Sequence, residues 1–450
     1  MTGKPGTRDS AAVAAIKGSG RMRKLLSRAA RLRPVDAPRE LSIVYKGEVL
    51  RLDSPQLGEL RKQVHAKGNK PNAAKTEAGR ALLVALWRQA KPRIDNLVPA
   101  EFSRDLGGRN EFLAFLDKWW PMLKPEDVLP TLADRGRLAA AASGVLNRGE
   151  TGLLATSLGA GGFTISDVPL LDELDQILGR PPKPSAPSSG GVAELTTVQD
   201  RLFTRASRAH RGPDYDGYAH IIVDEAQDLS PMQWRMLGRR GQLAGWTIVG
   251  DAAQSSWPDP GESRSAERTA LGRGPKHRFH MSTNYRNSAE IFDYAASIVR
   301  KEVPNADIPK AVRSTGIEPQ VLTVAEAGLP DEVARRVAEA LSQVEGTVGV
   351  IATPDRQAAL SSTLDGDDGV TMVGPLESKG LEYDAVVIVD FPAIVRDYTI
   401  RVGYVALTRA TQLLVRVDPS LATPSGVVFR GRSTRRRPPT ATARRPRSPG

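Results

Sequence analysis

The chain has no cysteine, few histidines and no long apolar run, and each absence removes a class of protein. Without Cys among its 450 residues, it has no disulfide framework, thiolate metal site or cysteine nucleophile, which is typical of a protein from a reducing cytosol. Only five His are present, so a histidine-rich metal centre has few ligands to draw on. No apolar stretch reaches about 18 residues, and no signal-peptide core follows the first charges. We therefore expect a cytoplasmic protein without a membrane partner.

The net charge of +12 indicates a polyanionic partner, but the charge is unevenly distributed. Residues 430–450 contain eight Arg and no acidic residue, so the rest of the chain carries only 12 − 8 = +4. A segment rich in Arg, Pro, Ser and Thr cannot bury a core, and we expect the tail at 421–450 to be disordered. Such a tail either binds phosphate backbones non-specifically or has no selected role, and both interpretations stay open.

The most informative stretch is residues 218–230, where an apolar run ends in Asp224-Glu225-Ala226-Gln227-Asp228. An acidic pair at the tip of a buried parallel strand has a specific use in nucleotide hydrolysis. One carboxylate holds Mg²⁺ through its water shell, and the next orients and deprotonates the attacking water. Asp224 suits the first role and Glu225 the second. Because many strands end in an acidic turn without this function, the interpretation depends on the residues downstream of the turn.

Four further blocks occur in a fixed order, at residues 246–257, 282–287, 377–384 and 404–410. They read WTIVGDAAQSSW, STNYRN, ESKGLEYD and YVALTRA. Together with the acidic turn, they resemble motifs II to VI of the superfamily 1 helicases of the UvrD/Rep type. Residues 18–22, residues 166–173 and about two hundred residues ahead of motif II resemble the HelD/HelR group, which remodels and recycles RNA polymerase.

The resemblance assigns a role to each matched residue of motifs III, IV and VI. Gln254 would sense the γ-phosphate and couple it to the nucleic-acid groove. Tyr285 would stack on adenine and Arg286 would contact the γ-phosphate, since an aromatic face suits a base and a guanidinium fork suits phosphate oxygens. Arg409 would be the arginine finger that stabilises transition-state charge. Taken alone, Arg409 can also be an ordinary charge on a helix surface.

The remaining matched positions complete the implied site. Glu382 would hydrogen-bond the ribose, and Gln227 and Gly380 would belong to the nucleotide-binding set. Trp257 would offer a stacking face to a base of single-stranded nucleic acid, although it can equally be a core or interface aromatic. The resemblance thus implies ATP and Mg²⁺ as cofactors. It implies single-stranded or duplex nucleic acid and the core RNA polymerase as partners.

One part of the family's machinery is missing. The phosphate-cradling loop, GxxxxGK followed by Ser or Thr, does not occur in the 450 residues. The Gly3-Lys4 pair is followed by Pro5, and the Gly-rich run at 159–162 contains no Lys. We therefore expect the chain to correspond to the carboxy-terminal part of such a motor and to lack independent ATP hydrolysis. The alternatives are a non-catalytic polymerase-binding protein and an inert gene fragment.

Apolar periodicity predicts an α/β protein with RecA-like, doubly wound parallel sheets preceded by a mainly helical region. Strands alternating with helices are expected at 246–250, 320–324, 347–352, 370–374, 384–390 and 412–416. The expected domains are residues 1–195 with a linker at 181–193, residues 196–275 and 276–420 as the two RecA-like parts, and the tail at 421–450. The first of these would resemble the insertion that contacts RNA polymerase.

Within the first region, we expect a basic helix over residues 18–33 and a hairpin over 41–53. A further helix over 110–123 would bring four aromatic residues close together, Phe112, Phe115, Trp119 and Trp120. These residues could line a groove, but their helical spacing favours a place in the core.

Overall fold

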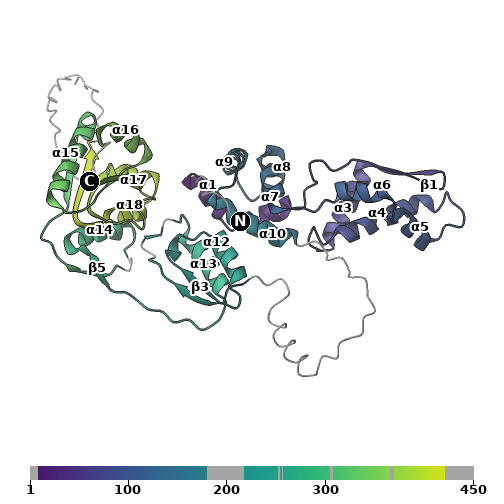
Figure 1. Cartoon of the computed structure of the whole chain (residues 1–450), viewed down its shortest axis with the longest axis horizontal. Helices are drawn as coiled ribbons and strands as arrows, with labels where there is room; N and C mark the ends of the chain where they lie inside the picture. The colour runs from purple at the N-terminus through teal and green to yellow at the C-terminus, as the bar shows by residue number, and fades with distance from the viewer. Residues whose placement is uncertain are drawn as a thin grey trace, which may run out of the picture. The chain divides into compact units, whose positions relative to one another are not determined.

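The computed structural model describes residues 9–179, 217–251, 254–255, 257–304, 308–364 and 369–420. The chain divides into two compact units, Met1–His280 and Met281–Gly450 (Figure 1). The expected linker at 181–193 and the basic tail at 421–450 lie outside the described residues. Every helix of the described part is too short or too polar to cross a bilayer.

The first unit begins with a helical bundle that we name lobe A. It consists of α1 (Ala11–Gly18), α2 (Met22–Ala29), α7 (Pro125–Val128), α8 (Arg135–Ala142), α9 (Arg148–Gly159) and α10 (Val168–Leu178), with 3-10 turns at Leu129–Ala133 and Ile165–Asp167. The basic helix expected over 18–33 is present as α2 but is shorter at both ends, Met22–Ala29. It does not begin at Gly18, because Ser19 adopts an extended backbone with ψ 141° and ends α1. The break lets Ile16 and Leu25, on two separate helices, enter the same core.

Lobe B is the second part of the first unit. It consists of β1 (Leu41–Tyr45), β2 (Glu48–Leu52), α3 (Ser54–Ala66), α4 (Lys75–Ala90), α5 (Pro99–Gly107) and α6 (Asn110–Trp119). The two strands pair antiparallel with Leu41 opposite Leu52, which confirms the hairpin. The four aromatic residues expected to cluster are each at most 9% exposed and belong to one core, so the core interpretation is confirmed.

The third part of the first unit contains β3 (His220–Val223), β4 (Gly245–Ile248), α12 (Pro231–Arg240) and α13 (Pro260–Leu271). The two strands are parallel. Side chains alternate across a strand, so Ile221 and Val223 face the helices and pack with Trp234. On the strand's other side Ile222 is 73% exposed, and Val249 just beyond β4 is 51% exposed. One face of this small sheet is thus open among the described residues.

The second unit is built on a five-stranded parallel sheet with the strand order β7-β11-β10-β8-β9. Its strands are β7 (Gln320–Val324), β8 (Val348–Ile351), β9 (Val370–Val373), β10 (Tyr383–Val389) and β11 (Ala410–Pro419). All five were expected within a few residues of these bounds. Two further strands, β5 (Thr283–Ser288) and β6 (Lys310–Arg313), form a separate parallel pair.

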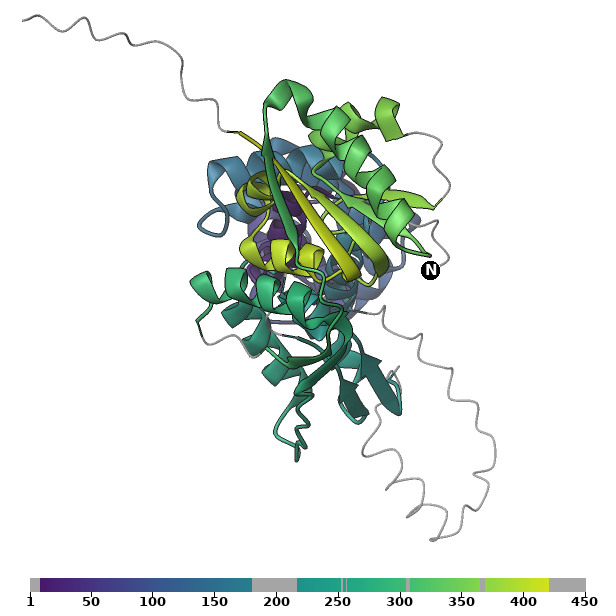
Figure 2. The same cartoon turned by 90° about the vertical axis from the view of Figure 1, so that its left-hand side faces the viewer.

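Helices cover both faces of the five-stranded sheet (Figures 1 and 2). On one face, α15 (Leu329–Gln343) and α16 (Pro354–Leu364) share a core with Val350, Val387 and Val415. The alternate residues Val386, Ile388 and Leu414 are buried as well. The helices α14 (Ala289–Glu302), α17 (Phe391–Asp397) and α18 (Ile400–Leu407) also contact β10 or β11. Burial on both faces explains why β10 is apolar almost throughout.

Candidate functional site

The acidic turn lies where expected, at the carboxyl end of β3. Asp224 is exposed and Glu225 is half-buried. Glu225 has a left-handed backbone with φ 50° and ψ 40°, and its amide donates a hydrogen bond of 2.8 Å to Asp224 Oδ1. A positive φ is uncommon for a residue other than glycine and is often found at functional sites. The turn therefore holds the two carboxylates in a defined relation.

Gln227 joins motif II to motif III. Its Nε2 donates to Glu225 Oε2 at 2.6 Å, and its Oε1 accepts the amide of Asp251 at 2.9 Å. Gly250 allows this approach, because a Cβ at that position would lie 2.7 Å from Gln227 Oε1. The sequence placed Gln227 in the nucleotide-binding set. The structure shows in addition that it connects the ends of two parallel strands.

The expected phosphate sensor, Gln254, is tied into the same turn. Its Nε2 donates to Asp251 Oδ2 at 2.8 Å. The next residue, Ser255, donates its hydroxyl to the carbonyl of Gln227 at 3.0 Å. Two hydrogen bonds of Gln227, to Asp251 and Ser255, thus join motif II to motif III. Two more order the side chains within each motif, Gln227 with Glu225 and Gln254 with Asp251.

Trp257 is half-buried and packs within the first unit. A Cβ built on Gly18 would lie 2.5 Å from the indole Cη2 atom, so the ring lies directly on the backbone of α1. The indole Nε1 is buried and has no hydrogen-bond partner among the described residues. Of the two interpretations open from the sequence, this packing favours an interface aromatic, and stacking on a nucleic-acid base stays a prediction.

In the second unit, the structure brings motifs IV, V and VI together. Arg286 forms an ion pair of 2.7 Å with Glu382, and both side chains are about half exposed. Asn287 is 3% exposed, and its Nδ2 donates to the carbonyls of Thr408 and Ala410 at 2.8 and 2.6 Å. Sequence reasoning gave no role to Asn287, because hydrogen bonds to backbone carbonyls far along the chain leave no local sequence pattern.

Arg409 is buried, so the interpretation as a helix-surface charge is wrong: the residue is 3% exposed. Its Nε donates to the carbonyl of Val405 at 3.0 Å and its Nη1 to the carbonyl of Leu381 at 3.2 Å. In this arrangement the guanidinium supports the loop of motif V. A role as arginine finger requires the side chain to leave these carbonyls, and it stays a prediction.

The structure gives the local geometry of two other expected positions in this unit, while their roles stay predictions. The side chain of Tyr285 is 76% exposed, which leaves its ring face open to a base. Gly380 has φ +77°, a conformation that side-chain-bearing residues rarely adopt. The glycine therefore allows the sharp turn that leads from motif V into β10.

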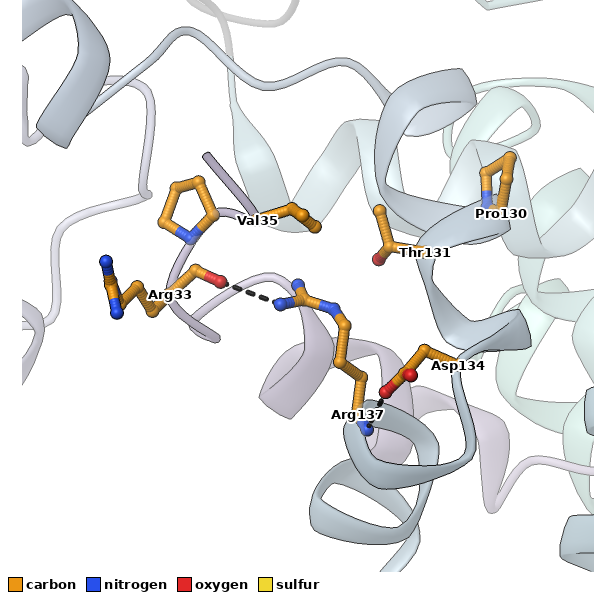
Figure 3. A pocket seen from close by; sticks show the side chains of 7 residues that line it. Arg33, Val35, Pro130, Thr131, Asp134 and Arg137 are labelled. Atoms are coloured by element: carbon orange, nitrogen blue, oxygen red, sulfur yellow. Dashed lines mark hydrogen bonds between the residues drawn. The ribbon is translucent and has the colours of Figure 1, made fainter. Parts of the chain in front are cut away.

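A hollow of about 500 Å³ lies in lobe A, between the segment after α2 and the start of α8. Figure 3 shows that two of its charged side chains bond within the protein: Arg137 Nη1 donates to the carbonyl of Arg33 at 2.8 Å, and Asp134 Oδ1 accepts the amide of Arg137 at 2.8 Å. No residue of the motifs lines it among those described. The hollow is therefore separate from the candidate site.

The donor set of the acidic turn fits Mg²⁺ held mainly through water. Among the described residues, no group of three His, Asp or Glu side chains is placed to chelate a metal. A single exposed carboxylate at Asp224 is enough for an ion that keeps most of its water shell. The residues present therefore fit Mg²⁺ and the orientation of a water, but they supply no cradle for the β- and γ-phosphates.

Comparison with known proteins gives a weak structural likeness. No protein-family model and no curated protein sequence matches the chain. Among solved structures, the chain is similar to an arterivirus nonstructural protein 10, a helicase whose structure was determined in complex with DNA. The identity is 19%, the TM-score is 0.27, and the match covers 45% of this chain and 40% of the helicase chain. The chain thus spans less than half of that helicase.

Proposed function

We propose that this chain is part of an ATP-dependent superfamily 1 helicase or translocase motor of the UvrD-like HelD/HelR group. The observation that supports this most is the hydrogen-bonded connection from Glu225 through Gln227 to Asp251 and Gln254. A phosphate sensor in motif III has to be mechanically joined to the acidic turn of motif II. The chain contains that hydrogen-bonded connection at the carboxyl ends of neighbouring parallel strands, which is where ligands of open α/β sheets bind.

The proposed roles come from the chemistry of each side chain. Asp224 holds the water shell of Mg²⁺, which would neutralise developing charge on the phosphates. Glu225 orients and deprotonates the attacking water, and Gln254 senses the γ-phosphate. In the second unit, Tyr285 stacks on adenine and Arg286 approaches the phosphates, which requires its ion pair with Glu382 to open.

The other proposed residues act on ribose, phosphate and the surrounding turns. Glu382 binds the ribose, Gly380 shapes the turn beside it, and Arg409 stabilises transition-state charge after release from its carbonyl partners. Single-stranded or duplex nucleic acid is the proposed substrate. RNA polymerase, contacted by lobes A and B in the cytoplasm, is proposed on the sequence resemblance alone.

Hydrolysis needs a phosphate cradle, and the open face of β3 and β4 is where a segment carrying it would pack. The exposed apolar side chains Ile222 and Val249 are suited to be covered by a further strand and helix. We therefore expect the purified chain to hydrolyse ATP no faster than its Glu225→Gln variant, with or without single-stranded DNA.

The test compares both proteins alone and fused to a strand–loop–helix segment with a Walker A loop from a UvrD-like helicase. The fusion should hydrolyse ATP, and Glu225→Gln should abolish this activity. Clear turnover by the unfused chain above its Glu225→Gln control would contradict the expected dependence on an added cradle. A folded fusion without Glu225-dependent hydrolysis would contradict the motor function itself.

A further inference from the structure

The turn between α1 and α2 makes two contacts, one with the end of motif III and one with α13 just after it. At the first, Gly18 lies under the indole ring of Trp257. A Cβ at Gly18 would lie 2.5 Å from the ring and 2.6 Å from Cβ of Ser230, which caps the start of α12 just after motif II. Only a glycine fits this position without displacing one of the two motif segments.

At the second place, Glu262 of α13 accepts two hydrogen bonds from the same turn. Its Oε1 accepts the amide of Gly20 at 2.9 Å and the hydroxyl of Ser19 at 3.2 Å. Ser19 is 5% exposed. A carboxylate that accepts two donors across an interface holds it more firmly than a neutral acceptor, because hydrogen bonds to charged groups are stronger.

A separate contact secures lobe A to α12. Met232 of α12 is buried in the core of lobe A. Glu173 of α10 is 2% exposed and pairs with Arg235 and Arg239 at 2.7 and 2.6 Å. Lobe A is therefore fixed to the helix after motif II, while its turn at residues 18–20 contacts Trp257 at the end of motif III and Glu262 of α13.

The contacts of the turn continue to the acidic residues. Trp257 and Glu262 come shortly after Gln254, and Gln254 is linked to Glu225 through Asp251 and Gln227. A displacement of the motif III turn therefore reaches Trp257 and Glu262 along a few residues of chain, and these two side chains contact lobe A directly. Such contacts transmit displacement, because close-packed interiors deform little.

We infer that Gly18, Ser19, Gly20, Trp257 and Glu262 form a joint through which the state of motif III is transmitted to lobe A. Trp257 and Glu262 are positioning residues in this joint. The inference rests on the proposed nucleotide role of motifs II and III only for what drives the movement. The mechanical connection can be tested without nucleotide.

The absence of cysteine allows a site-specific probe of the joint. In a Ser19→Cys variant of the full chain, the buried thiol reacts with a disulfide reagent only when the joint opens. Glu262→Ala should raise the labelling rate about tenfold, since a hydrogen bond to a charged group is lost. Trp257→Phe should also raise the rate, although a phenyl ring can still stack on a base.

The decisive variant is Gln227→Ala, because the hydrogen bonds of this side chain lie within motifs II and III. It should raise the labelling rate at position 19, as should the milder Gln227→Glu, whose carboxylate repels Glu225. The matched control is Gln63→Ala, an exposed amide on α3 that bonds Glu59 on the same helix. Circular dichroism and melting curves establish that each variant is folded.

Unchanged labelling in Gln227→Ala and Gln227→Glu, with faster labelling in Glu262→Ala, would show that the contact exists but is not coupled to motifs II and III, and would overturn the inference. Unchanged labelling in Glu262→Ala would show that no such joint holds the turn. Neither result depends on nucleotide binding, so neither would count against the motor function. Failure of the Walker A fusion, in turn, would leave the labelling result standing.

Discussion

His65 lies in the core of lobe B with both ring nitrogens buried and without a hydrogen-bond partner among the described residues. Its ring packs on Trp120 with 4.8 Å between centroids. Burial, with the nearby charges of Arg61 and Arg31, lowers the pKa of His65 from 6.5 to about 4. Between these two values the unfolded chain binds a proton that the folded chain excludes.

The free energy of unfolding should therefore be fully retained above about pH 6.5 and fall as the pH decreases towards about 4. His65→Leu removes both the titrating group and its unpaired nitrogens, so it should flatten this dependence and stabilise the protein at pH 5. Urea unfolding at pH 7 and pH 5 measures the difference. Gln63→Leu on the exposed face of the same helix serves as the control. An equally steep loss in the His65→Leu protein would assign the acid sensitivity to other groups.

At the scale of elements, the ion cluster between α10 and α12 joins parts that are far apart in the sequence. Arg239 contacts both Asp172 and Glu173 and is only 18% exposed. Burial would raise the pKa of Glu173, but hydrogen bonding to Arg235 and the charge of Arg239 outweigh it and lower the pKa. Glu173 therefore stays charged inside the protein, and the stability of this buried charge depends on its arginine partners.

Arg239→Ala should destabilise the first unit by about 3 kcal/mol, because loss of one partner leaves a buried carboxylate poorly compensated. Arg335→Ala is a matched control on α15, where Arg335 is 50% exposed and pairs with Glu332 and Glu339. That change should cost less than about 1 kcal/mol. Denaturant unfolding of both variants provides the measurement, and equal losses would mean that the α10–α12 cluster contributes no more than a surface pair.

At the scale of the whole molecule, the motifs are divided between the units. Motifs II and III belong to the first unit, and motifs IV to VI belong to the second. The charge is divided too, because eight of the net twelve positive charges lie in the tail. The proposed binding to nucleic acid would therefore have two separable sources, the tail and the motif-bearing units.

Deletion of residues 430–450 should weaken binding to single-stranded oligonucleotides and flatten its salt dependence. Each phosphate neutralised on a single strand contributes about −0.7 to the slope of log K against log salt concentration. Fluorescence anisotropy across a salt series measures the slope for the full and shortened chains. An unchanged slope would place the binding on the units rather than on the tail.

The sequence by itself determined the five strands of the sheet in the second unit, the hairpin and the position of the acidic turn, but it did not predict β5 and β6. These features depend on local rules. β10 is apolar because both its faces are buried. Asp224 and Glu225 follow β3, where the apolar strand ends and the chain turns. The aromatic residues in and just after α6 were assigned to the core by another local rule, because helical spacing places such residues on one face of the helix.

Only the tertiary structure decided which side chains act together. Trp257 packs on Gly18, and Asn287 donates to the carbonyls of Thr408 and Ala410. Arg409 is buried. Each of these arrangements depends on residues that are distant in the chain. Periodicity specifies the face of an element on which a residue lies, but not the partner that covers that face. That choice depends on how several elements pack at once, and packing is a property of the whole fold.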